Sequence, residues 1–112
     1  MTIFEKIASG QFPARIVFEA HDFVAFHDTS PQAPVHVLIV PRKCIPRLSD
    51  SRTDHTEMLG RMLLATREIA EKLGVLESGY RIVINNGRDA GESVPHLHVH
   101  LLAGRTMSWP PG

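Results

Sequence analysis

The sequence predicts an α+β fold: a five-stranded antiparallel sheet combined with one long helix and a short N-terminal helix. Three observations favour it. Short β-prone runs follow one another with brief connections, as in hairpins. A 3.6-residue apolar period is confined to one central segment. Near the C-terminus, apolar residues alternate with histidines, which is typical of a strand. With 112 residues, 43% of them apolar, the chain fits a single domain over residues 1–112.

A short helix is expected at the N-terminus, over Ile3–Ser9. Thr2 and Glu5 have the spacing of a capping box, and Gly10 follows as a stop signal.

Four strands are expected before the histidine-rich run. The runs Ile16–Glu19 and Phe23–His27 are separated by three residues and predict a hairpin. Val35–Val40 is rich in β-branched residues and stops at Pro41, which indicates another strand. Tyr80–Asn85 is the fourth.

The long helix is expected from about Asp54 to Leu73, and Gly74 closes it. Its apolar stripe from Met58 to Leu73 is interpreted as core or as a subunit contact. The preceding segment, Arg42–Thr53, is polar and predicted to be irregular.

The most informative motif is the run Pro95–Leu102, in which His96, His98 and His100 alternate with apolar residues. We expect one strand with an apolar face in the core and three imidazoles on the opposite face. Imidazoles at that spacing can act as neutral donors to a metal ion, or they can contact a phosphate. The row alone leaves both uses open.

The segment before this row favours phosphate chemistry. The loop Gly87–Ser93 is glycine-rich, offers backbone N–H groups and ends in a hydroxyl, and Asn85 adds a side-chain amide. A metal site requires none of these groups.

Composition excludes some partners. Lys plus Arg and Asp plus Glu both number 12, so no net charge attracts nucleic acid or a membrane surface. Cys44 is the only cysteine, which suits a reducing compartment. The longest apolar run, Val37–Val40, is too short to span a bilayer. We therefore expect a cytoplasmic protein.

The run His96–Leu102 resembles the signature of the histidine triad (HIT) superfamily of nucleotide hydrolases and transferases. The segments Phe26–His36 and Ile39–Lys43 resemble the Hint branch, and so does the ending Gly104–Gly112. The likeness covers nearly the whole chain and is weakest in Ser49–Glu77. It implies a single HIT domain that hydrolyses purine nucleoside phosphoramidates.

The resemblance also implies catalytic roles. His98 would attack the α-phosphorus, and water would release AMP or GMP from the nucleotidyl-histidine intermediate. His100 would bind phosphate oxygens, and His96 would orient the nucleophile. His36 would support the histidine network, and Ser93 would lie near the leaving group.

The implied nucleotide site draws on several segments. Asn85 and the loop residues Gly91, Glu92 and Ser93 would contact phosphate, and Asp28 would bind the ribose hydroxyls. An apolar slot for the purine base would be lined by Ile3, Phe4, Ile7 and Phe26. Simpler interpretations exist for two of these: an Asx-turn for Asp28 and a hydroxyl bonded to its own backbone for Ser93.

Three positions depart from the branch pattern. Pro95 replaces an aromatic residue, which changes little because a proline can start a strand. Thr29 replaces a bulkier aliphatic residue beside Asp28, so the base contact is expected to differ. Glu92 stands where Gln is usual. The sequence leaves three alternatives open for its carboxylate: it points away from the phosphate, it carries a raised pKa, or it favours an amine-bearing leaving group.

The resemblance requires no cofactor and implies a homodimer, with the C-terminal tail and Trp109 near the partner's active site. Three alternatives stay open. One is a zinc-binding regulatory protein that uses His36, His96, His98 and His100 as ligands. The others are a nucleotide-dependent interaction module and a dinucleoside polyphosphate hydrolase.

Overall fold

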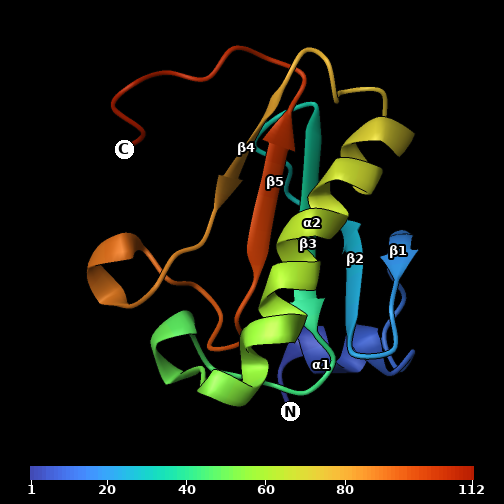
Figure 1. The fold of residues 1–112 in the computed structure, drawn as a ribbon, viewed down its shortest axis with the longest axis vertical. Helices are drawn as coiled ribbons and strands as arrows, with labels where there is room; N and C mark the ends of the chain where they lie inside the picture. Colours follow the sequence, from blue (N-terminus) through green and yellow to red (C-terminus); the bar gives the residue numbers. More distant parts are fainter.

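The computed structural model describes residues 1–112 and contains one five-stranded antiparallel sheet in the order β1-β2-β3-β5-β4 (Figure 1). Two α-helices accompany it, and the predicted fold class is confirmed. The strands are β1 (Ile16–Glu19), β2 (Phe23–His27), β3 (Val35–Pro41), β4 (Tyr80–Val83) and β5 (Val99–Ala103). The helices are α1 (Ile3–Ala8) and α2 (Thr56–Lys72), and the 3-10 turns are Leu48–Asp50, Thr53–His55 and Arg88–Ala90.

The two faces of the sheet carry separate apolar clusters. The long helix α2 crosses one face (Figure 1) and shares the larger cluster with inward-pointing strand residues. The short helix α1 covers part of the other face through Phe4, which packs with Val24, Phe26, Leu38 and Val40. Alternation along each strand therefore divides its residues between two cores, as the period of two requires.

Both helix predictions are confirmed to within two residues. Thr2 caps α1: its hydroxyl accepts the Glu5 N–H at 3.1 Å, and the Glu5 carboxylate accepts the Thr2 N–H at 3.0 Å. The stripe on α2 lies against the sheet, where Met62, Ile69 and Ala70 are fully buried. The stripe therefore packs in the core, which is the first of the two interpretations given for it.

The prediction of one strand across the whole histidine run is wrong in its first half. The strand ladder of β5 begins only at Val99, so His96 and His98 precede it. The backbone N–H of Leu97 donates to the Ile45 carbonyl at 2.7 Å instead of to a neighbouring strand. The carbonyl of Pro41, where β3 ends, accepts from the His96 ring. The ring N–H of His96 thus takes the place of a backbone N–H from a neighbouring strand as the donor to the Pro41 carbonyl.

Most of the imidazoles of this run lie inside the fold. His96 is fully buried and His98 is only 5% exposed, so two of the three rings are enclosed. The apolar alternation nevertheless holds in β5, because Val99, Leu101 and Ala103 face α2.

The chain after β5 turns sharply over the loop that precedes β3. Gly104 has φ of +93°, and an added Cβ would lie 2.7 Å from Cβ of Pro34. Next to it, the Arg105 guanidinium donates to the Gln32 carbonyl at 3.1 Å. The tail is thereby attached to the 28–34 loop before it runs out to Trp109, which is 82% exposed.

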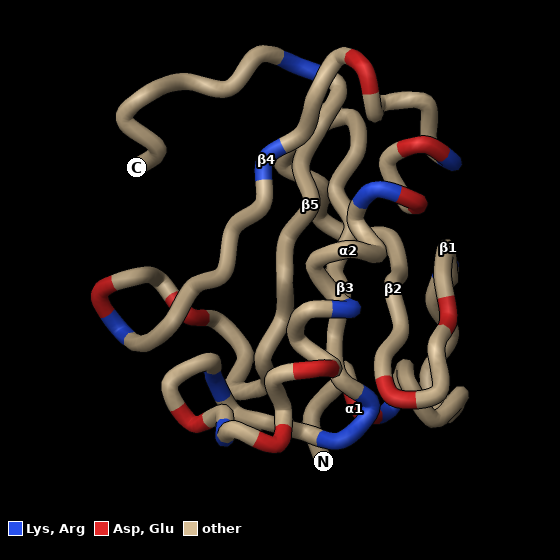
Figure 2. Tube along the Cα trace, in the orientation of Figure 1, with Lys and Arg blue, Asp and Glu red and all other residues tan.

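Charged residues of both signs are interspersed along the chain (Figure 2). Neither α-helix combines the length and the apolar composition that crossing a membrane demands.

Candidate active site

The histidines gather on the sheet face opposite α2. Leu38 of β3 pairs with His100 of β5, and His36 pairs with Leu102, so His36 and His100 are diagonal neighbours on that face. Their ring centroids lie 5.1 Å apart. The His98 ring continues the row, 4.9 Å from His100.

The backbone fixes the orientation of His98. Its Nδ1 lies 2.7 Å from the carbonyl oxygen of His96. Because a carbonyl only accepts, Nδ1 must carry the proton, and this assigns the lone pair of neutral His98 to Nε2. The contact that orients His98 therefore comes from the backbone of His96 and not from its imidazole.

A second set of hydrogen bonds assigns the opposite tautomer to His100. The Gln32 backbone N–H donates to Nδ1 of His36 at 3.0 Å, so neutral His36 carries its proton on Nε2. That Nε2–H donates to Nδ1 of His100 at 2.9 Å. Neutral His100 therefore carries its proton on Nε2 and can donate it. His98 thus offers a lone pair on Nε2, and the neighbouring His100 offers an N–H donor on Nε2.

His96 is held at both ring nitrogens. Its Nε2–H donates to the Pro41 carbonyl at 2.8 Å, and its Nδ1 accepts from the Thr2 hydroxyl at 2.7 Å. That hydroxyl also accepts the Glu5 N–H, so both of its functions are satisfied. Helix α1 is thereby attached to the histidine row, and no ring nitrogen of His96 is free for a ligand.

Burial keeps the supporting histidines neutral. Desolvation lowers the pKa of His36, against the opposing effect of the Asp28 carboxylate. It also lowers the pKa of His96. For His100, desolvation and then the neighbouring His98 and His36 lower the pKa to about 4. Near pH 7 His100 is a neutral donor and adds no positive charge beside His98.

An apolar pocket of about 260 Å³ adjoins the row. Phe4 lines it, and its ring packs edge-on against His98 with centroids 5.1 Å apart. The structure brings the expected base, ribose and leaving-group residues to this one pocket: Ile3, Phe4, Ile7, Phe26, Asp28, Thr29 and Ser93. Sequence reasoning did not assign Phe12, Leu38 and Val94, which also line it.

Asp28 lies at the rim of this pocket with its two carboxylate oxygens in different roles. Oδ1 accepts the Ser30 N–H at 2.8 Å, which is the Asx-turn of the simpler interpretation. Oδ2 faces Nε2 of His36 at 3.5 Å. The turn thus aims the second oxygen at the histidine network and the pocket rim.

Asn85 lies in a separate hollow of about 190 Å³ that it shares with Gln32, His36 and His100. It therefore lies beside His36 and His100 and is not among the residues that line the apolar pocket. Sequence reasoning missed Gln32, because its contribution is a backbone N–H that any residue except proline supplies.

The loop before the row is closed on itself. The N–H of Glu92 donates to the Gly87 carbonyl at 3.2 Å, and the N–H of Gly91 donates to the Arg88 carbonyl at 3.0 Å. Gly91 adopts φ of +80°, which favours glycine. No backbone carbonyl accepts the Ser93 N–H, so this group is available beside the pocket.

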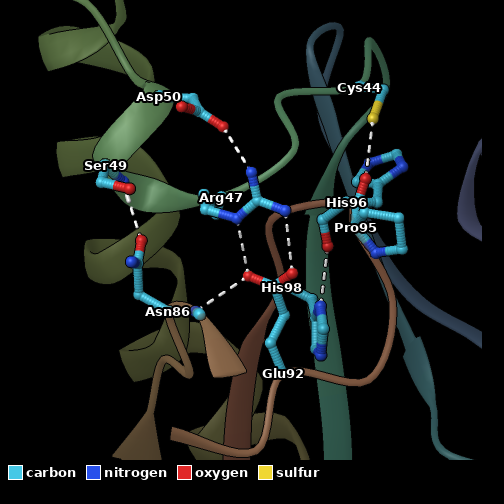
Figure 3. Close-up of polar contacts among 10 residues, drawn as sticks. Cys44, Arg47, Ser49, Asp50, Asn86, Glu92, Pro95, His96 and His98 are labelled. Atoms are coloured by element: carbon cyan, nitrogen blue, oxygen red, sulfur yellow. Dashed lines mark hydrogen bonds and ion pairs between the residues drawn. The ribbon is translucent and has the colours of Figure 1, made fainter. Parts of the chain in front are cut away.

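The Glu92 carboxylate is bound by Arg47. Nε and Nη2 of Arg47 donate to its two oxygens at 3.0 Å each (Figure 3). These bonds, followed by the Gly87 N–H, lower the pKa of Glu92, so the expectation of a raised pKa is wrong. The carboxylate points to Arg47. No spacing in the sequence signals this partner.

Two clusters bring potential metal ligands within 4.8 Å of one another: Glu5 with Cys44 and His96, and Asp28 with His36 and His100. Of the four histidines of the zinc hypothesis, His36 and His100 belong to one cluster, His96 belongs to the other, and His98 belongs to neither. Geometry therefore gives the four-histidine site no support.

The fold and the site together define an α+β domain with a histidine row next to an apolar pocket of about 260 Å³. The family model described as "HIT domain" matches residues 9–107. An uncharacterized HIT-like protein of Synechocystis is 49% identical over 99% of this chain and 96% of its own length.

Solved structures agree with this match. The HIT family hydrolase of Legionella pneumophila superposes with a TM-score of 0.96 at 45% identity, with both chains fully covered. A histidine triad protein of Clostridium difficile gives 0.91 at 37% identity, over 95% of this chain and 92% of its own. A histidine triad nucleotide-binding protein of Candida albicans gives 0.83 at 30%, over 98% and 83%. The chain belongs to the HIT family and has the fold of its hydrolases.

The lowered histidine pKa values predict how stability depends on pH. Between the folded-state and unfolded-state pKa values, the unfolded chain binds more protons, so the free energy of unfolding rises with pH. For His100 this window runs from about 4 to 6.5. Urea unfolding of the wild type should therefore show stability falling as pH drops below about 6.5. His100→Gln should flatten this dependence between pH 6.5 and 5; identical slopes in the two proteins would contradict the assignment.

Proposed function

We propose that this protein hydrolyses purine nucleoside phosphoramidates through a nucleotidyl intermediate on His98. One observation carries the proposal: the His96 carbonyl holds Nδ1–H of His98, which leaves the lone pair on Nε2 of a ring that packs against Phe4, a residue of the pocket. An imidazole in that tautomer is an oriented nucleophile at neutral pH. The relative from Legionella pneumophila is described as a HIT family hydrolase, and the relative from Candida albicans as a nucleotide-binding protein. Both descriptions are consistent with this activity.

The first step would transfer the nucleotidyl group to the ring. The Nε2 lone pair of His98 attacks phosphorus while the P–N bond breaks, and its electron pair leaves with the amine nitrogen. Ser93 delivers a proton to that nitrogen, either from its own hydroxyl or from a water that it orients. His100 donates Nε2–H to a phosphate oxygen, with Asn85 beside it.

The second step would release the product. A water oxygen attacks phosphorus while the P–Nε2 bond breaks, and the lone pair returns to His98. One proton of this water passes to the oxygen of Ser93, or of the water it orients, that gave up a proton in the first step. The products are a nucleoside monophosphate and a free amine. During the intermediate the His98 ring is positively charged, and its Nδ1–H bond to the His96 carbonyl strengthens because the donor is now charged.

The apolar pocket would hold the base between α1 and β2. The ring centroids of Phe4 and Phe26 lie 5.7 Å apart in this pocket. Ile3 and Ile7 add apolar lining from α1. Oδ2 of Asp28 at the rim would accept the ribose hydroxyls, and Gly91 with Ser93 would approach the phosphate. A reducing compartment such as the cytoplasm suits this site, because Cys44 is unpaired.

Removal of the nucleophile tests the proposal. His98→Ala should reduce hydrolysis of an adenosine phosphoramidate by at least about 10³-fold and change AMP affinity little. Mass spectrometry of quenched wild-type protein should find an adenylyl group on His98. A wild type that binds AMP but never turns over this substrate would contradict the proposal.

We also propose a homodimer, in which the tail of one chain reaches the active site of its partner. Strand β4 is at an edge of the sheet and pairs with β5 alone, and exposed strand edges are usually covered in folded proteins. Leu63 and Leu64 of α2 and Trp109 of the tail are exposed apolar side chains. Pairing would cover part of this surface.

Light scattering at micromolar concentration should give about twice the chain mass of 12.5 kDa. Trp109 is the only tryptophan, so its fluorescence reports on the tail. Its emission should move to longer wavelength when dilution separates the chains. A monomer whose emission does not change with concentration would overturn the proposed dimer.

A further inference from the structure

We propose that the Arg47–Glu92 ion pair is a positioning device that holds the Gly87–Ser93 loop at its working distance from His98. This inference rests on the proposed function, because the loop carries Ser93 and its free N–H. It concerns two residues that the proposed chemistry does not itself use.

The pair joins two segments that are distant in sequence. Arg47 lies between β3 and α2, and Glu92 directly precedes Ser93. Both carboxylate oxygens are bound in a bidentate arrangement, which specifies orientation as well as distance (Figure 3). The Glu92 side chain is 13% exposed and that of Arg47 is 33% exposed, so the pair is only partly screened by water.

Glu92 also closes its own loop. Its Oε1 accepts the Gly87 N–H at 3.0 Å, and its backbone N–H donates to the Gly87 carbonyl at 3.2 Å. One residue therefore fixes both ends of the loop. If the carboxylate were lost, the Gly87 N–H and the Arg47 fork would both lose their acceptor.

Further contacts hold the same two segments together. The Ser49 N–H donates to the Asn86 side-chain oxygen at 2.8 Å, and the Cys44 thiol lies 3.3 Å from the Pro95 carbonyl (Figure 3). Arg47 is itself held by Asp50 at 2.9 Å. The arginine is thus preoriented, and the segment 44–50 contacts the loop at Glu92 and the residues that flank it, Asn86 and Pro95.

The consequence for the reaction follows from where the loop ends. Glu92 is the residue before Ser93, so a displaced carboxylate moves the Ser93 hydroxyl and N–H relative to the His98 ring. Misplacement of reacting groups by about 1 Å costs on the order of 10²-fold in rate. The pair therefore acts on the chemical step more than on nucleotide affinity.

The test compares Arg47→Met, Glu92→Ala and the double variant. Each single variant should lower kcat on an adenosine phosphoramidate by roughly 10- to 100-fold, with a smaller change in KM. The double variant should be no worse than Glu92→Ala, because Glu92→Ala already removes the Arg47–Glu92 contact together with the Gly87 bond. Glu92→Gln and Arg47→Lys keep part of the hydrogen bonding and should recover part of the rate.

Amide hydrogen exchange supplies a readout that needs no substrate. Exchange at the hydrogen-bonded amides of Gly91 and Glu92 should be faster in Arg47→Met and Glu92→Ala than in the wild type. Arg52→Met is the matched control, because Arg52 makes a similar two-pronged pair with Asp54 that does not touch the loop. It should change neither exchange nor kcat.

Two results would overturn the inference: loop exchange that matches the control, or kcat losses that add in the double variant. If the wild type does not cleave a phosphoramidate, the proposed function fails. The exchange experiment still decides whether the pair holds the loop.

Discussion

The 2.7 Å hydrogen bond from Nδ1–H of His98 to the carbonyl of His96 is the contact on which the arrangement of the site depends. It exists because the backbone leaves the strand ladder before Val99, so that this carbonyl faces a side chain. A regular strand would place His96 and His98 on one face, with the carbonyl directed at a neighbouring strand. Because the ladder ends before Val99, the His96 carbonyl is available to bind Nδ1–H of His98, and the lone pair of His98 is left on Nε2.

The rest of the row complements this bond. A backbone N–H sets the tautomer of His36, and His36 sets that of His100, so the ring beside the nucleophile presents a proton. Burial keeps His100 uncharged, with its pKa lowered to about 4. On the other side, the Thr2 hydroxyl and the Pro41 carbonyl hold the His96 ring. A helix cap, a strand end and a loop amide together define the tautomers of His36, His96 and His100.

Much of the fold followed from local patterns. The capping box at Thr2 and the 3.6-residue period that ends at Gly74 predicted both helices, because these signals are contained within a few neighbouring residues. The end of the β5 ladder could not be predicted, since it depends on Ile45 and Pro41, more than fifty residues away, accepting the local hydrogen bonds. The residues of the base pocket could be assigned only through family resemblance. Arg47 and Gln32 were missed, because an ion-pair partner in an irregular segment and a backbone donor leave no periodic signal.

The most direct test of this account is the tautomer of each histidine, read from long-range ¹H–¹⁵N NMR correlations of the ligand-free protein. At pH 8, where imidazoles are neutral, His98 should carry its proton on Nδ1, and His36, His96 and His100 should carry theirs on Nε2. Spectra of His98→Ala and His100→Gln would assign the key signals. A proton on Nε2 of His98 would contradict the account, because that nitrogen would then have no lone pair for phosphorus.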